Sequence, residues 1–161
     1  MIKGTNITKE KKNMQNNMED QVLSIEQMNV LSKLGVDCSK ASVEVGSVNS
    51  IEYNNDGSTN ENEFDICFFK PDGIKPTCLY TSYRSFTIYD LMMLLPENVV
   101  IKRKKIECTF YLKVEKDSPT NWCVSYENDD LFLVSHSASM LITCVYDMVI
   151  TCIQEGYIKN K

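Results

Sequence analysis

Polar residues between positions 52 and 63 match the spacing of a calcium-binding loop. Oxygen-bearing side chains fall at the ligand positions of the EF-hand pattern, and a glycine falls at its turn position. The first position is Glu rather than Asp, however, and the flanking residues favour strands. A hairpin loop rich in Asn and Asp explains the same residues, so we predict no bound metal and no cofactor. If the loop does bind an ion, the candidate ligands are Glu52, Asn54, Asp56, Asn60 and Glu63.

His136 is the only histidine, and Ser137 follows it directly. Together with Asp147 these residues could suggest a catalytic triad. Adjacent Ser and His side chains do not normally face each other, however, and the glycines of a nucleophile elbow are missing. Cys–His catalysis would require the fold to bring Cys108 or Cys123 to the histidine. We therefore interpret His136 as a solvated or capping residue at the start of a helix, and we predict no catalytic residue.

The composition argues against several classes of function. The chain has 161 residues and a formal net charge of −5, which disfavours nonspecific binding to nucleic acid or to an anionic membrane. Its six glycines are scattered, without a phosphate-binding pattern. The seven cysteines include no CxxC pair, and the N-terminus lacks the apolar segment of a signal peptide. We expect free thiols and a cytoplasmic protein without a membrane span.

Residues 137–156 predict a long C-terminal helix. Ser137 is a good N-cap, and Gly156 can adopt the left-handed conformation that ends a helix. On a helical wheel the apolar residues cover one broad face with Val145 at its centre, and a narrow polar strip contains Asp147. The apolar run is too short for a membrane span and is interrupted by that acidic residue. We therefore predict a core helix packed on a sheet.

The remaining elements are shorter. Two capping boxes predict two helices, and alternating or continuous apolar runs predict strands. The helices should begin after Ser24 and Thr87 and end at Gly35 and Pro96. The strands should cover residues 43–53, 64–69, 77–83, 106–114, 122–126 and 131–134. The second and third of these strands should pair as a hairpin.

These elements predict an α+β fold. It should contain a mainly antiparallel sheet of about six strands and three helices, with the C-terminal helix packed on the sheet. Residues 22–158 should form a single domain. Residues 1–21 contain almost no apolar side chains, so we expect them to be disordered.

The strand at 106–114 alternates strictly between apolar and polar residues, which indicates one buried face. Trp122 and Tyr126 should lie on that face. The register that keeps both residues on this face places Trp122 beside Val114 and Tyr126 beside Phe110. A slip of one residue would turn Trp122 outward.

Two pairs of side chains could contact a partner. Tyr83 and Tyr89 belong to a cluster of aromatic residues that is explained either by core packing or by a protein-contact patch. Met140 and Ile150 border the polar strip of the C-terminal helix and should be exposed. We take these four residues as candidate interaction residues, and a homo-oligomer remains open.

Three stretches resemble a known group of proteins. They are LSIEQMNVLSKLGVDCSKAS from position 23, FTIYDLMMLLPENV from position 86 and MVITCIQEGYI from position 148. Together they resemble small uncharacterised proteins encoded by phages and mobile elements of gut bacteria. The resemblance implies a cytoplasmic protein of phage or mobile-element origin, and it implies no particular activity.

The leading hypothesis is a small non-enzymatic interaction protein that modulates a host or defence factor. Its basis is an ordinary core without a catalytic constellation. The alternative is a small enzyme, or a ligand- or nucleotide-binding module, with its site near His136 or the 52–63 loop. A deep polar pocket would favour the enzyme, and a flat apolar patch would favour the partner protein.

Overall fold

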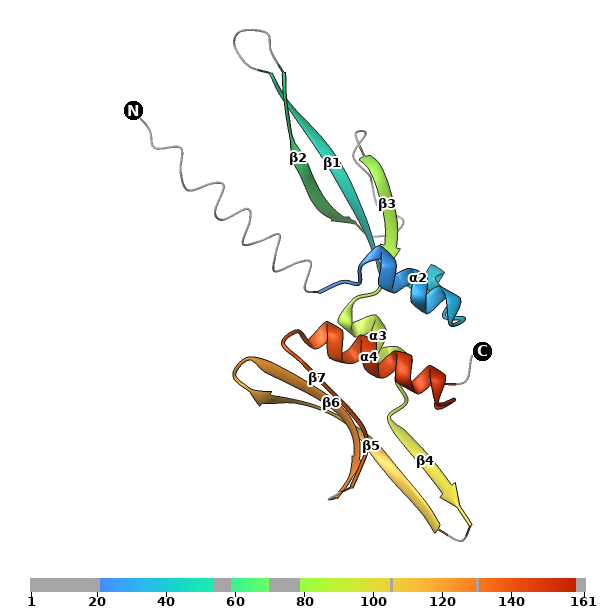
Figure 1. Cartoon of the computed structure of the whole chain (residues 1–161). Coiled ribbons are helices and arrows are strands. Elements are labelled where there is room, and N and C mark those ends of the chain that lie inside the picture. The colour runs from blue at the N-terminus through green and yellow to red at the C-terminus, as the bar shows by residue number, and fades with distance from the viewer. Residues whose placement is uncertain (1–20, 54–58, 70–78, 105, 130, 159–161) are drawn as a thin grey trace.

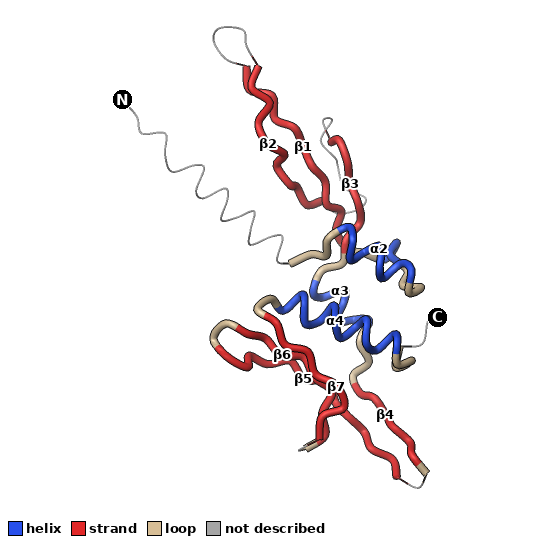
Figure 2. The backbone as a smooth tube through the Cα atoms, in the orientation of Figure 1, coloured by secondary structure: helices blue, strands red, loops and turns tan. Residues whose placement is uncertain are grey.

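Two antiparallel sheets lie on either side of a layer of helices (Figure 1). The computed structural model describes residues 21–53, 59–69, 79–104, 106–129 and 131–158. Figure 2 shows the described helices between the two groups of strands. The predicted α+β fold is confirmed, with three described α-helices and seven described strands that divide into two sheets. The N-terminal segment predicted to be disordered lies outside the described residues, apart from Gln21.

The first sheet consists of three antiparallel strands. They are β1 Val43–Tyr53, β2 Thr59–Phe69 and β3 Leu79–Ser85. Their order is β2-β1-β3, so the predicted hairpin between 64–69 and 77–83 is wrong: β2 and β3 lie on opposite edges of β1. Only five residues separate β1 from β2, which favours direct antiparallel pairing of these two strands. β3 then pairs along the remaining edge of β1.

The two predicted capping boxes are confirmed. They begin two of three short helices, which are α2 Ile25–Lys33, the 3-10 helix η1 Cys38–Lys40 and α3 Ile88–Leu94. Ser24 Oγ accepts a hydrogen bond from the Gln27 backbone N–H at 3.3 Å, and Thr87 and Asp90 form the equivalent pair at α3. Gly35 ends α2 with a φ of +87°, a conformation that favours glycine.

The second sheet consists of four antiparallel strands in sequential order. They are β4 Asn98–Arg103, β5 Ile106–Ser118, β6 Asn121–Asn128 and β7 Leu131–Ala138. No strand is predicted from the sequence for the residues of β4. Lys102 belongs to this strand, and Lys104 has a φ of +54° at the turn into β5.

Trp122 and Tyr126 lie on the predicted face of the second sheet, but the register differs by two residues. Tyr126 lies opposite Leu112, and Trp122 lies opposite Lys116. The difference arises because β5 extends to Ser118, so that only two residues separate it from β6 instead of a loop of about seven. A shift of two residues leaves every side chain on its original face.

The C-terminal helix α4 spans Leu141–Gln154, and its N-cap is Met140 rather than the predicted Ser137. Ser137 lies in β7 opposite Cys123. Strand pairing with β6 therefore outweighs the local preference of serine for a helix N-cap. The end of the helix is as predicted, since Gly156 follows it with a φ of +74°. None of the described helices is long and apolar enough to cross a membrane.

The apolar face of α4 fills the centre of the core, as predicted. It packs on β6 and β7, where Val124 and Tyr126 are fully buried. The Tyr126 hydroxyl donates a hydrogen bond to the Pro96 carbonyl oxygen at 2.5 Å, which links the sheet to the chain that follows α3. The buried residues of α4 are Ile142, Cys144, Val145, Met148, Val149 and Cys152.

Replacing Val145 by alanine measures the contribution of this core. The substitution deletes two buried methyl groups and leaves a cavity, so the free energy of unfolding should fall by about 1.5–3 kcal/mol. Gln154→Ala, at an exposed position of the same helix, is the control and should change it by less than about 0.5 kcal/mol. Urea denaturation followed by circular dichroism measures both values. Equal effects of the two substitutions would contradict the buried position of Val145.

Candidate functional site

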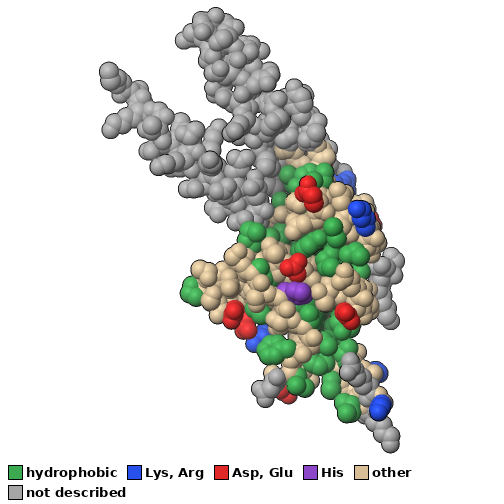
Figure 3. All heavy atoms as spheres, in the orientation of Figure 1, with side chains coloured by type: hydrophobic (Ala, Val, Ile, Leu, Met, Phe, Trp, Pro, Cys, Tyr) green, Lys and Arg blue, Asp and Glu red, His purple; other side chains and the backbone are tan. Residues whose placement is uncertain are grey.

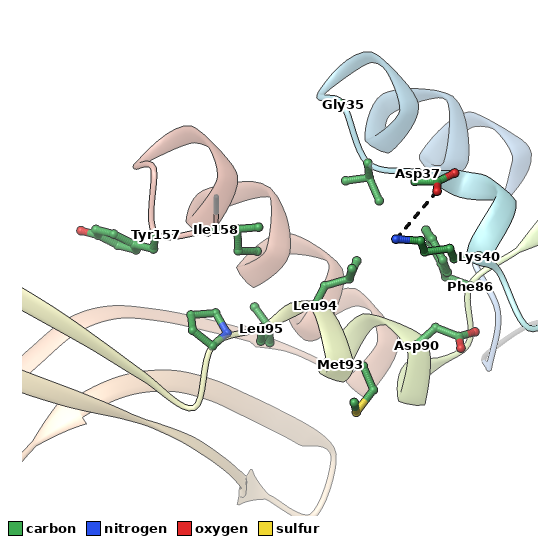
Figure 4. A pocket seen from close by; sticks show the side chains of 12 residues that line it. Gly35, Asp37, Lys40, Phe86, Asp90, Met93, Leu94, Leu95, Tyr157 and Ile158 are labelled. Carbon is green, nitrogen blue, oxygen red and sulfur yellow. Dashed lines mark ion pairs between the residues drawn. The ribbon is translucent and has the colours of Figure 1, made fainter. Parts of the chain in front are cut away.

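An open groove of about 710 Å³ lies between the end of α2, helix α3 and the segment that follows α4 (Figure 4). Leu94 projects from α3 into the space between the other two segments. Three charged side chains also line the groove, but most of the lining is apolar. The main apolar lining residues are Val36, Phe86, Leu94, Leu95, Pro96 and Ile158.

One side of the groove is formed by the chain that leaves α2. Gly35 N–H donates to the Ser32 carbonyl oxygen at 3.0 Å, and Val36 N–H donates to the Leu31 carbonyl oxygen at 3.0 Å. This pair of hydrogen bonds is a Schellman motif, which closes a helix through a glycine of positive φ. The turn fixes the direction in which Val36 leaves the helix and so places its side chain at the groove.

The opposite side is formed in the same way by the chain that leaves α4. Gly156 N–H donates to the Ile153 carbonyl oxygen at 3.1 Å. The Cys152 carbonyl oxygen accepts from Tyr157 N–H at 2.8 Å and from Ile158 N–H at 3.1 Å. These bonds hold Tyr157 and Ile158 against the end of the helix, where both line the groove.

An ion pair lies on the α2 side of the groove. Lys40 Nζ is 3.8 Å from Asp37 Oδ2 (Figure 4). Asp37 also caps η1, because Oδ1 accepts hydrogen bonds from the Ser39 hydroxyl at 2.6 Å and the Ser39 N–H at 3.1 Å. Those bonds lower the pKa of the Asp37 carboxyl. The two opposite charges largely offset each other on this side.

Asp90 connects α3 to the first sheet. Its Oδ2 accepts from the hydroxyl and N–H of Ser42, at 2.6 and 3.3 Å, and from the N–H and hydroxyl of Thr87, at 2.8 and 2.9 Å. Partial burial raises the pKa of the Asp90 carboxyl, but the hydrogen bonds from Ser42 and Thr87 outweigh that effect and keep the pKa below its usual value. Asp90 is therefore ionised at neutral pH and adds a negative charge to the groove lining.

The four predicted interaction residues differ in exposure. Tyr83 is half-buried and donates its hydroxyl hydrogen bond to the Leu23 carbonyl oxygen at 3.3 Å, whereas Tyr89 is 71% exposed. Met140 is 40% exposed, as expected. Ile150 is half-buried and packs against the core, whereas the sequence predicts that it is exposed.

His136 lies in β7 and not at a helix start. Its Nε2 is 2.9 Å from the Thr151 hydroxyl of α4, so the ring forms a hydrogen bond between strand and helix. Successive side chains of a strand point to opposite faces, which separates Ser137 from the imidazole. The position gives His136 a structural role and does not assemble the triad that its sequence neighbours could suggest.

Three of the five candidate metal ligands lie in the paired strands β1 and β2. Glu52 in β1 lies opposite Asn60 in β2, and Glu63 lies further along β2. Asn54 and Asp56 lie outside the described residues. An EF-hand loop is flanked by helices, whereas β1 and β2 extend into residues 52–63 from both ends. Within the described part of the chain, no group of three or more His, Cys, Asp or Glu side chains could hold a metal ion.

Five cysteine side chains are described, and all five are free thiols. Burial raises the pKa of Cys152 to about 11 and also raises the pKa of Cys144. Thiols with a raised pKa are poor nucleophiles at neutral pH. Cys123 is less buried, and its Sγ lies 3.3 Å from the Ser135 hydroxyl rather than beside a base. The described thiols therefore give no support to Cys–His catalysis.

The residues that line the groove are not among those predicted from the sequence. The sequence marks two of them, since Val36 and Tyr157 directly follow the glycines that end α2 and α4. An apolar residue at that position commonly packs back on its own helix. Its participation in a groove depends on the approach of α3, which carries no local signature.

Comparisons of the chain with models of protein families, with curated proteins and with solved structures found no match. The groove and the exposed side chains therefore carry the functional interpretation.

Asp90→Asn should destabilise the fold by about 1 kcal/mol, because it weakens charge-assisted hydrogen bonds that are partly screened by solvent. Asp37→Asn, whose carboxylate is exposed, is the control and should have a smaller effect. The stabilisation that Asp90 provides over asparagine should be complete above the ordinary aspartate pKa of about 3.9. It should disappear as the pH falls through the lowered pKa of Asp90 in the folded protein. Urea titrations at a series of pH values measure it. A difference that grows on acidification would contradict the ionised state.

Alkylation should distinguish the thiols. In the folded protein at neutral pH, iodoacetamide should modify Cys123 more than tenfold faster than Cys144 and Cys152, since these two are fully buried and have raised pKa values. After unfolding without reductant, all seven cysteines of the sequence should react. Peptide mass spectrometry reads both results. Fewer than seven modified residues would contradict the expectation of free thiols.

Proposed function

We propose that this protein is a small non-enzymatic interaction protein whose groove holds an apolar segment of a partner protein. The supporting observation is the groove itself, whose lining is mostly apolar and has Leu94 near its centre. Exposed apolar grooves of this kind bind amphipathic segments, whose apolar side chains leave water on docking.

The polar groups of the groove favour a protein segment over a small polar substrate. Small-molecule and catalytic sites depend on polar groups that converge on the ligand. Here Asp37 and Lys40 pair with each other, and the Asp90 carboxylate accepts four hydrogen bonds from Ser42 and Thr87. These charged groups therefore already serve the fold.

The charge of the groove points to a basic partner. The charges of Asp37 and Lys40 offset each other, so Asp90 leaves the lining with one net negative charge. The whole chain has a formal net charge of −5. A segment with apolar residues and at least one Lys or Arg would complement both the centre and the rim of the groove.

The resemblance to phage and mobile-element proteins gives this proposal a biological setting. A protein of that origin would act in the bacterial cytoplasm, and its partner would be a host or defence factor that it modulates. The alternative of an enzyme or a nucleotide-binding module near His136 gains no support from that residue, because its Nε2 is already hydrogen-bonded to the Thr151 hydroxyl.

Selection from a phage-displayed library of random peptides tests the proposal. The selected peptides should contain two or more apolar residues together with a Lys or Arg. Leu94→Asp and Ile158→Asp place a carboxylate in the groove, so each should weaken binding of the selected peptides at least tenfold in fluorescence-anisotropy titrations.

Tyr89→Asp is the matched control, because Tyr89 is exposed on α3 but does not line the groove. It should change affinity by less than about twofold, and thermal melts should show that all three variants remain folded. Failure to select any such peptide would refute the proposal. So would binding that is unchanged by both groove substitutions but lost in Tyr89→Asp.

A further inference from the structure

Strand β7 forms one edge of the second sheet and carries no Lys, Arg, Asp, Glu or Pro. The other three edges of the two described sheets all carry charge: Lys102 lies in β4, Arg84 in β3 and Glu61 in β2. Charged side chains on edge strands discourage the addition of another strand. Among the described edges, β7 is the one without this protection.

Exposed apolar side chains lie at both ends of β7. Leu131 is 61% exposed and Phe132 is 66% exposed at its start, and Met140 is exposed just beyond its end. Figure 3 shows hydrophobic side chains at the surface over the second sheet. The pairing with β6 shifts register between Phe132 and Val134. Residues 134–138 therefore form a regular stretch, and no described strand pairs with its other edge.

We propose that β7 pairs antiparallel with β7 of a second copy of this chain. A two-fold axis perpendicular to the sheet is the symmetry that joins a strand to its own copy in this way. It keeps α4 of both copies on the same face and joins two four-stranded sheets into one of eight strands. If the axis passes beside His136, the regular stretches pair completely, with Ser135 opposite Ser137 of the second copy.

The edge fits a second copy because it is complementary to itself. In the antiparallel pair, the end of β7 that contains Leu131 and Phe132 lies near the Ala138 end of the other copy, where Met140 is exposed. Because of the two-fold symmetry, this apolar contact occurs twice in the dimer. The absence of fixed charge along β7 means that two copies do not repel each other along the paired edge.

Sedimentation equilibrium of the full chain tests this pairing. The wild-type protein should sediment at about 37 kDa, twice the 18.5 kDa of the chain. Two double variants place like charges across the proposed pair: Ser135→Lys with Ser137→Lys, and Ser135→Glu with Ser137→Glu. Both serines are exposed, so the fold should tolerate the changes, and circular dichroism checks it. Each variant alone should raise the dissociation constant of the dimer at least tenfold.

An equimolar mixture of the two double variants should dimerise again, because every Lys then lies opposite a Glu. Val100→Lys, which adds a charge to the opposite edge strand β4, is the control and should remain a dimer. A wild-type monomer at several hundred micromolar would overturn the proposal. So would a mixture that stays monomeric, or a loss of the dimer in Val100→Lys equal to that in the β7 variants.

Discussion

The burial of α4 is the constraint on which the rest of this structure depends. Six residues of its 14 are buried, and they pack against a sheet whose own inward residues Val124 and Tyr126 are fully buried. At roughly 1.5–3 kcal/mol for each large apolar side chain removed from water, this contact is a large favourable term in folding. Of the other helices, α3 packs on α4, whereas α2 contacts β3 and η1.

Helix α3 shows how that placement creates the groove. Its N-terminal end is held to the start of the first sheet by the hydrogen bonds that Asp90 accepts from Ser42, the residue before β1. The chain after its C-terminal end is held to the second sheet by the bond from Tyr126 to Pro96. These bonds hold α3 in place beside its neighbours. The groove beside Leu94 lies between the glycine-terminated ends of α2 and α4.

The features that are predictable from the sequence are those determined within a few residues. The capping boxes at Ser24 and Thr87 and the glycine helix ends follow from local hydrogen bonding, so the structure agrees with them. Ser137 has an equally good local signal, but its strand pairing opposite Cys123 determines its position instead. The predicted β2–β3 hairpin is wrong for a related reason, since β2 and β3 each pair with β1, on opposite edges, and not with each other.

The groove was beyond local prediction because it combines residues that are distant in the chain. Val36, Leu94 and Ile158 each have a simple local explanation as an apolar residue near a helix end. Only the approach of α2, α3 and α4 converts them into one surface. The candidate metal ligands illustrate the reverse case, because their spacing matches an EF-hand loop whereas Glu52, Asn60 and Glu63 lie in two paired strands.

The two proposed contact surfaces lie on different sides of the molecule, and this bears on how they could act together. The strand order places β4 and β7 at opposite edges of the second sheet. Helix α3, which forms the centre of the groove, leads directly into β4. Pairing through β7 would therefore leave both grooves of a dimer accessible. Two grooves on one rigid body bind a partner with two suitable segments more tightly than either groove alone, because the second contact is intramolecular. A weak apolar groove could in this way give a useful affinity for an oligomeric partner.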